Sequence, residues 1–272
     1  MQPFINIDLG GPAQPLLKVN HLLKYFRGGK GREVVQAVDD ISFTVMKGET
    51  LGVVGESGCG KSTTARLLMQ LLTQDSGELI FDGQGVGSSR LPLKAYRRQV
   101  QMVFQDSYAS LNPRLTMEES IAFGQRVHGV SAREASEYAR YLLAHVGLEP
   151  ARFADRYPHA LSGGQRQAIT LLMATVLTPK ILLLDEPTAG MDALSRRQMW
   201  NLLKKLNQQK LTILLTTHYM EEAETLCDRV GFMCGGRLEE TDAPGHMIET
   251  LGRYAVDETS PDGLKSHYFH GK

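Results

Sequence analysis

The stretch GVVGESGCGKSTTARLL, residues 52–68, decides the fold of this chain. The stretch begins with apolar residues, continues with three closely spaced glycines, and ends with apolar residues at helical spacing. Residues 55–62 match the pattern G-x-x-x-x-G-K-[ST], in which the backbone N–H groups of a glycine-rich turn surround a phosphate. The helix that follows points its positive end at the same place. The stretch therefore predicts a strand–loop–helix unit that binds the phosphates of a nucleotide.

Two side chains of this loop have predicted roles. Lys61 is expected to neutralise the β- and γ-phosphates, and Ser62 to ligate Mg²⁺. A glycine-rich turn before an ordinary helix is the alternative, but the loop follows an apolar strand and opens a helix, which is the context that phosphate binding requires. Other residues of the loop are expected to contact the nucleotide: Gly55, Ser57, Gly58, Cys59, Gly60 and Thr63.

A second apolar strand, ILLL at 181–184, runs into Asp185 and Glu186. Asp185 is predicted to hold Mg²⁺, directly or through water. Glu186 is predicted to be catalytic, because a carboxylate just beyond the metal ligand can orient and deprotonate a water molecule. His218 ends the next strand, where it could reach the γ-phosphate, although a lone His at a strand end is more often a packing or surface residue.

Apolar strands and amphipathic helices alternate along most of the chain, which predicts an α/β fold with a mostly parallel sheet flanked by helices. Helices are expected at 61–72 and 194–207, and a hairpin at 229–240. Residues 107–160 differ, since polar amphipathic segments replace the apolar strands, and they are predicted to form a helical insert. Within the insert, Ser131 and Glu134 fit a capping box, and Gly147 fits a helix stop.

The composition is that of a globular protein, with 42% hydrophobic and 22% charged residues among 272. Thirty basic residues balance thirty acidic ones, which disfavours binding to nucleic acid through charge. The three cysteines suit neither a disulfide framework nor a zinc site. We expect no signal peptide and no membrane span, because the longest apolar runs fall well short of about 20 residues.

Residues 161–165, LSGGQ, lie between the phosphate loop and the LLLDEP segment. With this motif the sequence resembles the ATP-binding subunit of an ABC transporter, over roughly residues 16–250. The resemblance implies that Phe26 stacks on adenine, with Tyr25 as the second candidate. It also implies that Gln105 senses Mg²⁺ and the γ-phosphate, and that His218 is a switch histidine.

The resemblance also assigns residues that act across a dimer. It implies that Ser162, Gly163, Gly164 and Gln165 close over the ATP held by the opposite subunit, and that Asp192 communicates between subunits. A glycine pair exposes backbone N–H groups at a helix start, which suits this task. The implied assembly is a head-to-tail dimer, of identical or related chains, with two ATP molecules between the subunits.

The implied fold is a P-loop NTPase core with an N-terminal antiparallel β region and a helical insert. The expected organisation is a leader at 1–15, an ATPase domain at 16–255 with its helical subdomain at about 107–175, and a polar tail at 256–272. The resemblance implies ATP and Mg²⁺ as cofactors and separate membrane permease subunits, with a substrate-binding protein, as partners. The location it implies is peripheral, at the cytoplasmic face of the cell membrane.

The sequence says less about the transported substrate, because different segments resemble different branches of the ABC transporter family. AVDDISFTV at 37–45 and VFQDSYASLNPRLT at 103–116 resemble the peptide and nickel importers, which favours import of peptides or nickel. The segment 185–203 and the segment 216–238 resemble drug-efflux and other exporters, so export is the alternative. A soluble ABC ATPase of DNA repair or translation is disfavoured by the single phosphate loop, and a dead regulatory homologue by Glu186 and His218.

Overall fold

The computed structural model describes residues 14–27, 34–246, 255–260 and 263–268. Among these residues a six-stranded sheet has the order β10-β9-β3-β8-β7-β6. All neighbours in it are parallel except the hairpin β9–β10, so the predicted mostly parallel sheet and the predicted hairpin are confirmed. Its strands are β3 (Thr50–Val54), β6 (Val100–Val103), β7 (Ile181–Asp185), β8 (Thr212–Thr217), β9 (Arg229–Cys234) and β10 (Arg237–Asp242).

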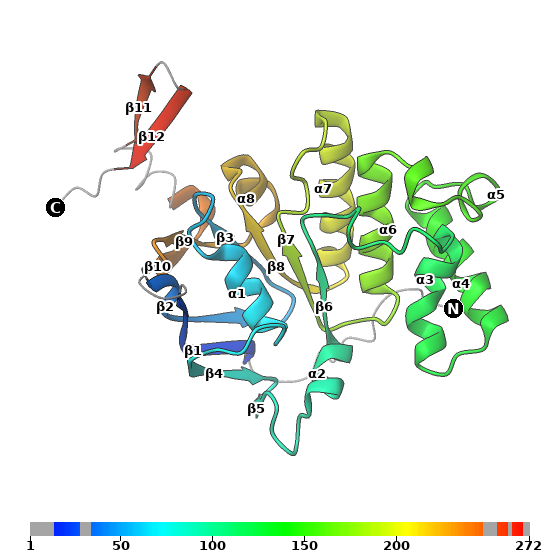
Figure 1. The fold of residues 1–272 in the computed structure, drawn as a ribbon, viewed down its shortest axis with the longest axis horizontal. Helices are drawn as coiled ribbons and strands as arrows, with labels where there is room; N and C mark the ends of the chain where they lie inside the picture. Colours follow the sequence, from blue (N-terminus) through cyan, green and yellow to red (C-terminus); the bar gives the residue numbers. More distant parts are fainter. Residues whose placement is uncertain (1–13, 28–33, 247–254, 261–262, 269–272) are drawn as a thin grey trace.

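Helices cover both faces of this sheet, which explains why its central strands are continuously apolar (Figure 1). Leu183 and Leu214 lie in the same buried cluster as one side of α1. The alternate residues Leu184 and Leu215 lie in the cluster that includes α7. The helices around the sheet are α1 (Lys61–Leu68), α6 (Gly163–Thr175), α7 (Ala193–Gln208) and α8 (Met220–Leu226).

Helix α1 is shorter than the predicted helix over 61–72, because it ends at Leu68. Gln70, just beyond its end, has a φ of 56°, the left-handed conformation that commonly terminates a helix. The prediction was wrong here because the apolar residues continue at helical spacing past the point where the backbone turns.

An antiparallel sheet of order β2-β1-β4-β5 confirms the N-terminal β region. Its strands are β1 (Pro15–Arg27), β2 (Val34–Met46), β4 (Ser76–Phe81) and β5 (Gln84–Gly85). Its apolar face shares one buried cluster with α1 and the large sheet. Tyr96 of α2 (Leu93–Gln99) closes this cluster, with its hydroxyl donating to the Leu68 carbonyl oxygen at 2.6 Å.

The predicted helical insert contains α3 (Met117–Val127), α4 (Ala132–His145), α5 (Pro150–Phe153) and a 3-10 turn, η1 (Pro158–Ala160). These helices gather beyond α6 at one end of the sheet (Figure 1) and have a hydrophobic cluster of their own. Ser131 caps α4 by accepting from the Glu134 N–H, but the Glu134 carboxylate accepts from the Ser131 hydroxyl rather than from backbone. Thus half of the predicted capping box forms. Gly147 has a φ of 77°, as a helix stop requires.

Helix α6 belongs to two clusters. Its residues Ile169 and Leu172 pack with the helical insert, whereas Leu171 and Ala174 pack with the sheet and α7. Past residue 254, β11 (Ala255–Ser260) and β12 (Gly263–Tyr268) pair as an antiparallel hairpin where the sequence predicts only a polar tail. The leader at residues 1–13 lies outside the described residues. Within the described ranges, the helices are all too short or too polar to cross a bilayer.

Candidate active site

Four neighbouring parallel strands end at the same edge of the large sheet, and the predicted site residues follow them. Strand β3 leads into the phosphate loop, and β6 leads to Gln105. Strand β7 ends at Asp185, and His218 follows β8 directly. Ligands of open α/β sheets bind outside the carboxyl ends of the strands. The topology therefore brings together residues from the phosphate loop at 55–62 and from as far along the chain as His218.

The phosphate loop is held so tightly that one of its glycines admits no side chain. Gly60 has a φ of 109°, and a Cβ there would lie 2.0 Å from the Ala37 carbonyl oxygen. Lys61 is 3% exposed, and its ammonium donates to the carbonyl oxygens of Gly55 and Glu56, each at 2.7 Å. The Lys61 ammonium is thus held against the backbone of the phosphate loop.

Ser62 and Asp185, the two predicted Mg²⁺ ligands, are in contact. The Ser62 hydroxyl donates to Asp185 Oδ1 at 2.8 Å, and Asp185 is 2% exposed. Thr216 of β8 also donates to Asp185 Oδ1, at 2.7 Å. Sequence reasoning missed Thr216, because no motif marks it and its contact with Asp185 arises only from the pairing of β7 with β8.

Glu186 is the meeting point of the remaining predicted residues. Gln105 donates from Nε2 to Glu186 Oε2 at 3.1 Å, and His218 Nδ1 lies 3.2 Å from the same oxygen. Lys61 Nζ lies 3.8 Å from Glu186 Oε1. Glu186 has a φ of 47°, which is strained for a residue with a side chain and is the kind of strain found at active sites. A carboxylate is therefore presented among a cation, an amide and an imidazole.

The signature residues form the start of α6. Ser162 accepts from the Gln165 N–H, and the Gln165 side chain accepts from the Ser162 N–H, which completes a capping box. Gly163 is exposed. Gly164 approaches α7 closely, because a Cβ there would lie 2.8 Å from Ser195 Oγ. Among the described contacts, none joins these residues to the phosphate loop of the same chain.

Asp192 caps α7, accepting from the backbone N–H of Ser195 at 2.9 Å and from its hydroxyl at 2.6 Å. These bonds lower the pKa of the Asp192 carboxyl below its ordinary range. Ser195 also lies against Gly164, so Asp192 and the signature helix meet through Ser195. Sequence reasoning missed Ser195, which no motif marks.

The two candidate aromatic residues at the end of β1 differ in their surroundings. The Tyr25 hydroxyl donates to Asp39 Oδ1 at 2.5 Å, and this bond raises the pKa of the phenol. Phe26 is 40% exposed, and the Lys24 ammonium lies 5.6 Å from its ring centroid. No described contact joins either ring to the phosphate loop. Phe26 therefore offers a free ring face, whereas Tyr25 is engaged in the fold.

The other predicted residues of the phosphate loop differ in exposure. Ser57 and Gly58 are exposed at the tip of the loop, and Thr63 is half-buried in the first turn of α1. Burial raises the pKa of the Cys59 thiol, so this side chain stays a neutral packing group. In the part of the chain that the structure describes, no cluster of three or more His, Cys, Asp and Glu side chains could hold a metal ion.

The chain matches a family model described as ABC transporter over residues 38–189. It is 43% identical to the oligopeptide transport ATP-binding protein OppF of Bacillus subtilis (strain 168), over 87% of this chain and 78% of that protein. It is 42% identical to AppF, an oligopeptide transport ATP-binding protein of the same organism, over 84% of this chain and 71% of that protein.

The fold is similar to that of a dimeric ATP-binding cassette whose structure holds ADP and Pi in a post-hydrolysis state. The TM-score is 0.75 and the sequence identity 28%, and the match covers 84% of this chain and 98% of that one. The likeness confirms the predicted fold class, including the mixed sheet and the antiparallel N-terminal region.

Proposed function

Because this chain belongs to the ABC transporter family of ATP-binding, ATP-hydrolysing subunits, we propose that the cluster around Glu186 hydrolyses ATP to drive peptide import through a separate permease. The observation that carries the proposal is the convergence of Lys61, Gln105 and His218 on the Glu186 carboxylate. Lys61 begins α1, Gln105 follows β6 and His218 follows β8, so only the complete fold creates the cluster.

Each member of the cluster has a task in this proposal. Glu186 accepts a proton from the attacking water, since it is 12% exposed and can be reached from the cleft. Lys61 leaves its two carbonyl partners to neutralise the phosphates. Gln105 and His218 hold the Glu186 carboxylate by its Oε2 and orient it toward the γ-phosphate. The exposed ring of Phe26 stacks on adenine.

The residues present fit Mg²⁺. Ser62 and Asp185 place a hydroxyl and a buried carboxylate 2.8 Å apart, and oxygen ligands are those that Mg²⁺ prefers. The absence of a larger acidic cluster among the described residues also fits, because Mg²⁺ at nucleotide sites takes one or two protein ligands and completes its shell with phosphates and water. Bound there, with Gln105 nearby, it would neutralise charge developing on the phosphates.

We also propose a head-to-tail dimer. Ser162 and Gly163 are exposed at the start of α6, and the N-terminus of a helix is suited to an anion. A second subunit that supplies its phosphate loop would meet this helix start. The structural relative's dimeric state supports the arrangement. Asp192, through Ser195 and Gly164, would pass changes at one site to the signature helix.

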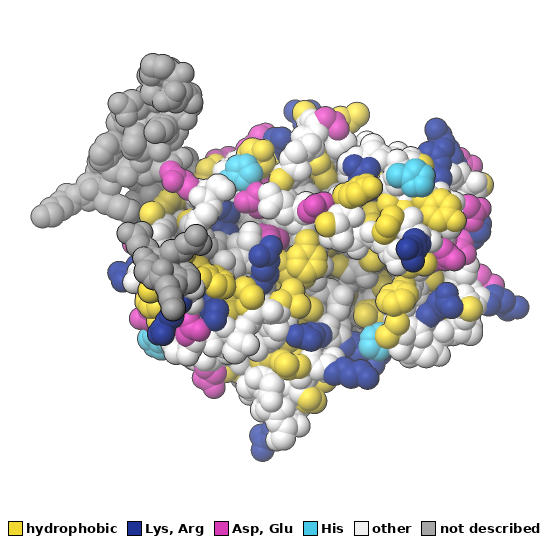
Figure 2. Space-filling model, in the orientation of Figure 1, with side chains coloured by type: hydrophobic (Ala, Val, Ile, Leu, Met, Phe, Trp, Pro, Cys, Tyr) yellow, Lys and Arg dark blue, Asp and Glu magenta, His cyan; other side chains and the backbone are white. Residues whose placement is uncertain are grey.

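The helical subdomain, about residues 107–175, is proposed as the docking surface for the permease. Among the residues that the structure describes, it carries half of the large exposed apolar side chains, and Figure 2 shows several apolar side chains on the surface of this part of the molecule. Apolar surface of this kind marks an interaction site. The exposed apolar residues of this subdomain are Tyr108, Phe123, Val127, Val130, Tyr141 and Tyr157.

Import of peptides is favoured over export because OppF and AppF, which match 84–87% of this chain, are oligopeptide transport proteins. Their matches include the later segments that resemble exporters. We propose the cytoplasmic face of the membrane as the location and a substrate-binding protein as a further partner. Crosslinking from Phe123 and Val127 identifies the bound permease, and recovery of an exporter-type permease instead would overturn import.

Substitution of Glu186 by Gln tests the hydrolytic site. The Gln amide cannot take the proton of the attacking water, so we expect ATP turnover to fall by about 10²- to 10⁴-fold while ATP binding persists. Turnover is measured by phosphate release and binding by equilibrium titration with ATP. Unchanged turnover in Glu186→Gln would refute the role of this carboxylate.

A further inference from the structure

Glu222 of α8 is a buried acid that the proposed reaction does not use. Its relative exposure is 0%, and its Oε1 accepts from the Thr188 hydroxyl at 2.8 Å and from the Trp200 indole N–H at 2.9 Å. Its Oε2 is buried and has no hydrogen-bond partner in the described structure. A buried carboxylate oxygen without a partner is costly, so its presence calls for a reason other than stability.

The two donors to Glu222 come from segments that carry proposed site residues. Thr188 lies two residues after Glu186, in the loop that leads to Asp192. Glu222 itself lies four residues after His218, on α8, which begins two residues beyond this histidine. Trp200 lies in α7, the helix that Asp192 caps. One carboxylate oxygen thus joins the loop of the proposed base, the segment of the proposed switch histidine, and α7.

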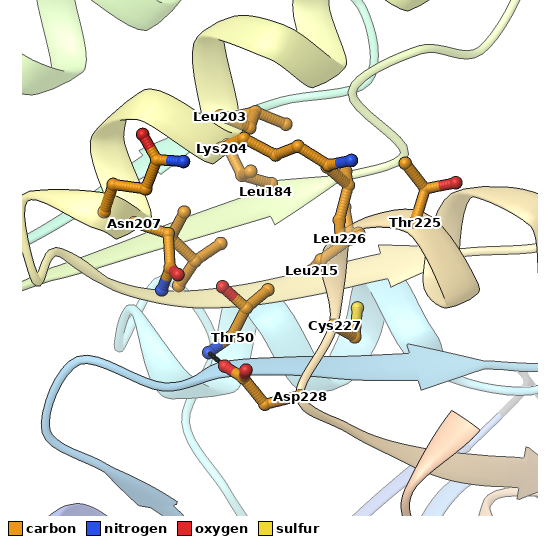
Figure 3. A pocket seen from close by; sticks show the side chains of 12 residues that line it. Thr50, Leu184, Leu203, Lys204, Asn207, Leu215, Thr225, Leu226, Cys227 and Asp228 are labelled. Atoms are coloured by element: carbon orange, nitrogen blue, oxygen red, sulfur yellow. Dashed lines mark hydrogen bonds between the residues drawn. The ribbon is translucent and has the colours of Figure 1, made fainter. Parts of the chain in front are cut away.

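The Glu222 hydrogen bonds matter because α7 and α8 are not closely packed along their whole length. A cavity of about 210 Å³ lies between the two helices, and Figure 3 shows Leu203 and Lys204 of α7 on one side and Thr225 and Leu226 of α8 on the other. Close packing is therefore incomplete at the carboxyl end of α8. The Glu222 hydrogen bonds fix the other half of α8, nearer to His218.

We propose that Glu222 is a positioning residue for ATP hydrolysis, which sets the distance between His218 and Glu186 by tying α8 to the Thr188 loop. The inference rests on the proposed roles of Glu186 and His218. The two residues are 3.2 Å apart at His218 Nδ1 and Glu186 Oε2, and a small displacement of α8 or of the loop would break this contact. Because Glu222 lies outside the nucleotide site, it affects turnover and leaves ATP binding in place.

Substitution of Glu222 by Leu removes both hydrogen bonds and keeps a side chain of similar length. We expect kcat to fall about tenfold or more with KM for ATP changed less than about threefold, because misplacement of reacting groups by about 1 Å can cost 10²-fold. Glu222→Gln keeps an acceptor oxygen for Thr188 and Trp200, and we expect it to recover most of the wild-type kcat. Glu224→Leu, the same change at an exposed position of α8, is the matched control.

Trp200 gives an independent readout, because it is the only tryptophan of the chain and its N–H donates to Glu222. Indole emission responds to hydrogen bonding, so ATP should shift the emission of the Glu186→Gln protein, in which ATP is held without turnover. Thr188→Val removes only the link to the loop. We expect this second substitution, which preserves side-chain shape, to abolish the ATP-dependent shift and to lower kcat even if Glu222→Leu does not fold.

The outcomes separate this inference from the proposed function. If ATP turnover is lost in Glu186→Gln but kcat is that of wild type in Glu222→Leu or in Thr188→Val, the positioning role of Glu222 is refuted. The proposed function is then still supported. Parallel loss of ATP affinity and kcat in Thr188→Val would also overturn the positioning role, because that pattern indicates general damage. Wild-type ATP turnover in Glu186→Gln would refute the proposed function itself.

Discussion

Among single residues, Asp185 shows how the carboxylate proposed to bind Mg²⁺ is held in place. It lies at the end of a buried strand, and hydroxyl groups from Ser62 and Thr216 both donate to its Oδ1. These bonds satisfy a carboxylate that would otherwise be costly to bury, and they fix its orientation. Thr216 also approaches the backbone N–H of Glu186, at 3.3 Å from Oγ1 to N. The Thr216 hydroxyl therefore contacts both Asp185 and Glu186.

Replacement of Thr216 by Val removes this hydroxyl and preserves side-chain shape. We expect Mg²⁺-dependent ATPase activity to fall about 10- to 100-fold, the usual cost of losing a partner of a metal ligand. Activity measured against Mg²⁺ concentration should shift toward higher Mg²⁺, and Thr216→Ser should restore most of it.

Thr212→Val is the matched control, because Thr212 is a buried threonine at the other end of the same strand and its hydroxyl also makes a hydrogen bond, with the Gly48 N–H. It should affect stability but leave the Mg²⁺ dependence unchanged. Equal Mg²⁺ dependence in wild type and Thr216→Val would contradict the role given to Thr216.

Lys61, Asp185 and Glu186 could be predicted from sequence because each lies in a short local motif whose geometry is fixed by the backbone. Thr216 could not, since its partner lies 31 positions earlier and meets it only through the pairing of β7 with β8. Glu222 is a similar case, with its partner Thr188 on another element. Residues whose role depends on pairing between elements are the ones that sequence patterns leave unmarked.

Among secondary-structure elements, Asp39 ties the antiparallel sheet to the large one. It lies in β2 and accepts from Tyr25 of β1, and its Oδ2 accepts from Arg237 of β10 at 2.8 Å. The Tyr25 hydroxyl, and then Arg237, hold the pKa of the Asp39 carboxyl below its ordinary value of 3.8. Ionised Asp39 therefore favours the folded protein.

The sign of the pH effect follows from this lowered pKa. The contribution of Asp39 is present in full above 3.8, the ordinary value, and is lost as pH falls through the lower pKa of the folded state. We expect the Tm of wild type to exceed that of Asp39→Asn near neutral pH, and the difference to shrink below about pH 3.8. Thermal unfolding followed by circular dichroism across pH 3–7 measures it.

Asp40→Asn provides the comparison, because Asp40 is an exposed neighbour whose φ of 55° Asn tolerates well. Its Tm, measured over the same pH range, gives the effect of the same Asp-to-Asn change at an exposed neighbouring position. A Tm difference for Asp39→Asn that grows on acidification would show that the folded state does not favour the ionised carboxyl.

Strands and helices could be predicted where burial of one or both faces produces a regular spacing of apolar residues in the sequence. Apolar runs such as ILLL at 181–184 form strands buried on both faces, as predicted. The end of α1 was mispredicted, because a backbone turn at Gln70 and not a change of side-chain pattern ends the helix. The hairpin β11–β12 was not predicted, because its polar sequence lacks the apolar alternation of a half-buried strand.

For the whole molecule, the important feature is that α6 belongs to two cores. One side packs in the helical insert and the other against the sheet, and the signature residues lie at its start. Any movement of the insert relative to the sheet therefore moves Ser162 and Gly163. In the proposed assembly, a permease docked on the insert would in this way influence how Ser162 and Gly163 meet the nucleotide of the second subunit.

The proposed dimer can be tested in Glu186→Gln, where ATP persists. We expect ATP to double the mass from 30.1 kDa, as measured by size exclusion with light scattering. Ser162→Arg adds a long cation at the tip of α6, where it would obstruct the facing subunit, and should abolish the ATP-dependent dimer while each subunit still binds ATP.

Ser131→Arg is the control for this last prediction. Ser131 also caps a helix of the insert by accepting from the N–H three residues on, so both substitutions lose the same type of cap. Only position 162 is proposed to face the second ATP, and Ser131→Arg should therefore still dimerise. Equal dimer formation by both variants would mean that the signature helix does not close the interface, and equal loss by both would trace the effect to destabilised helix ends.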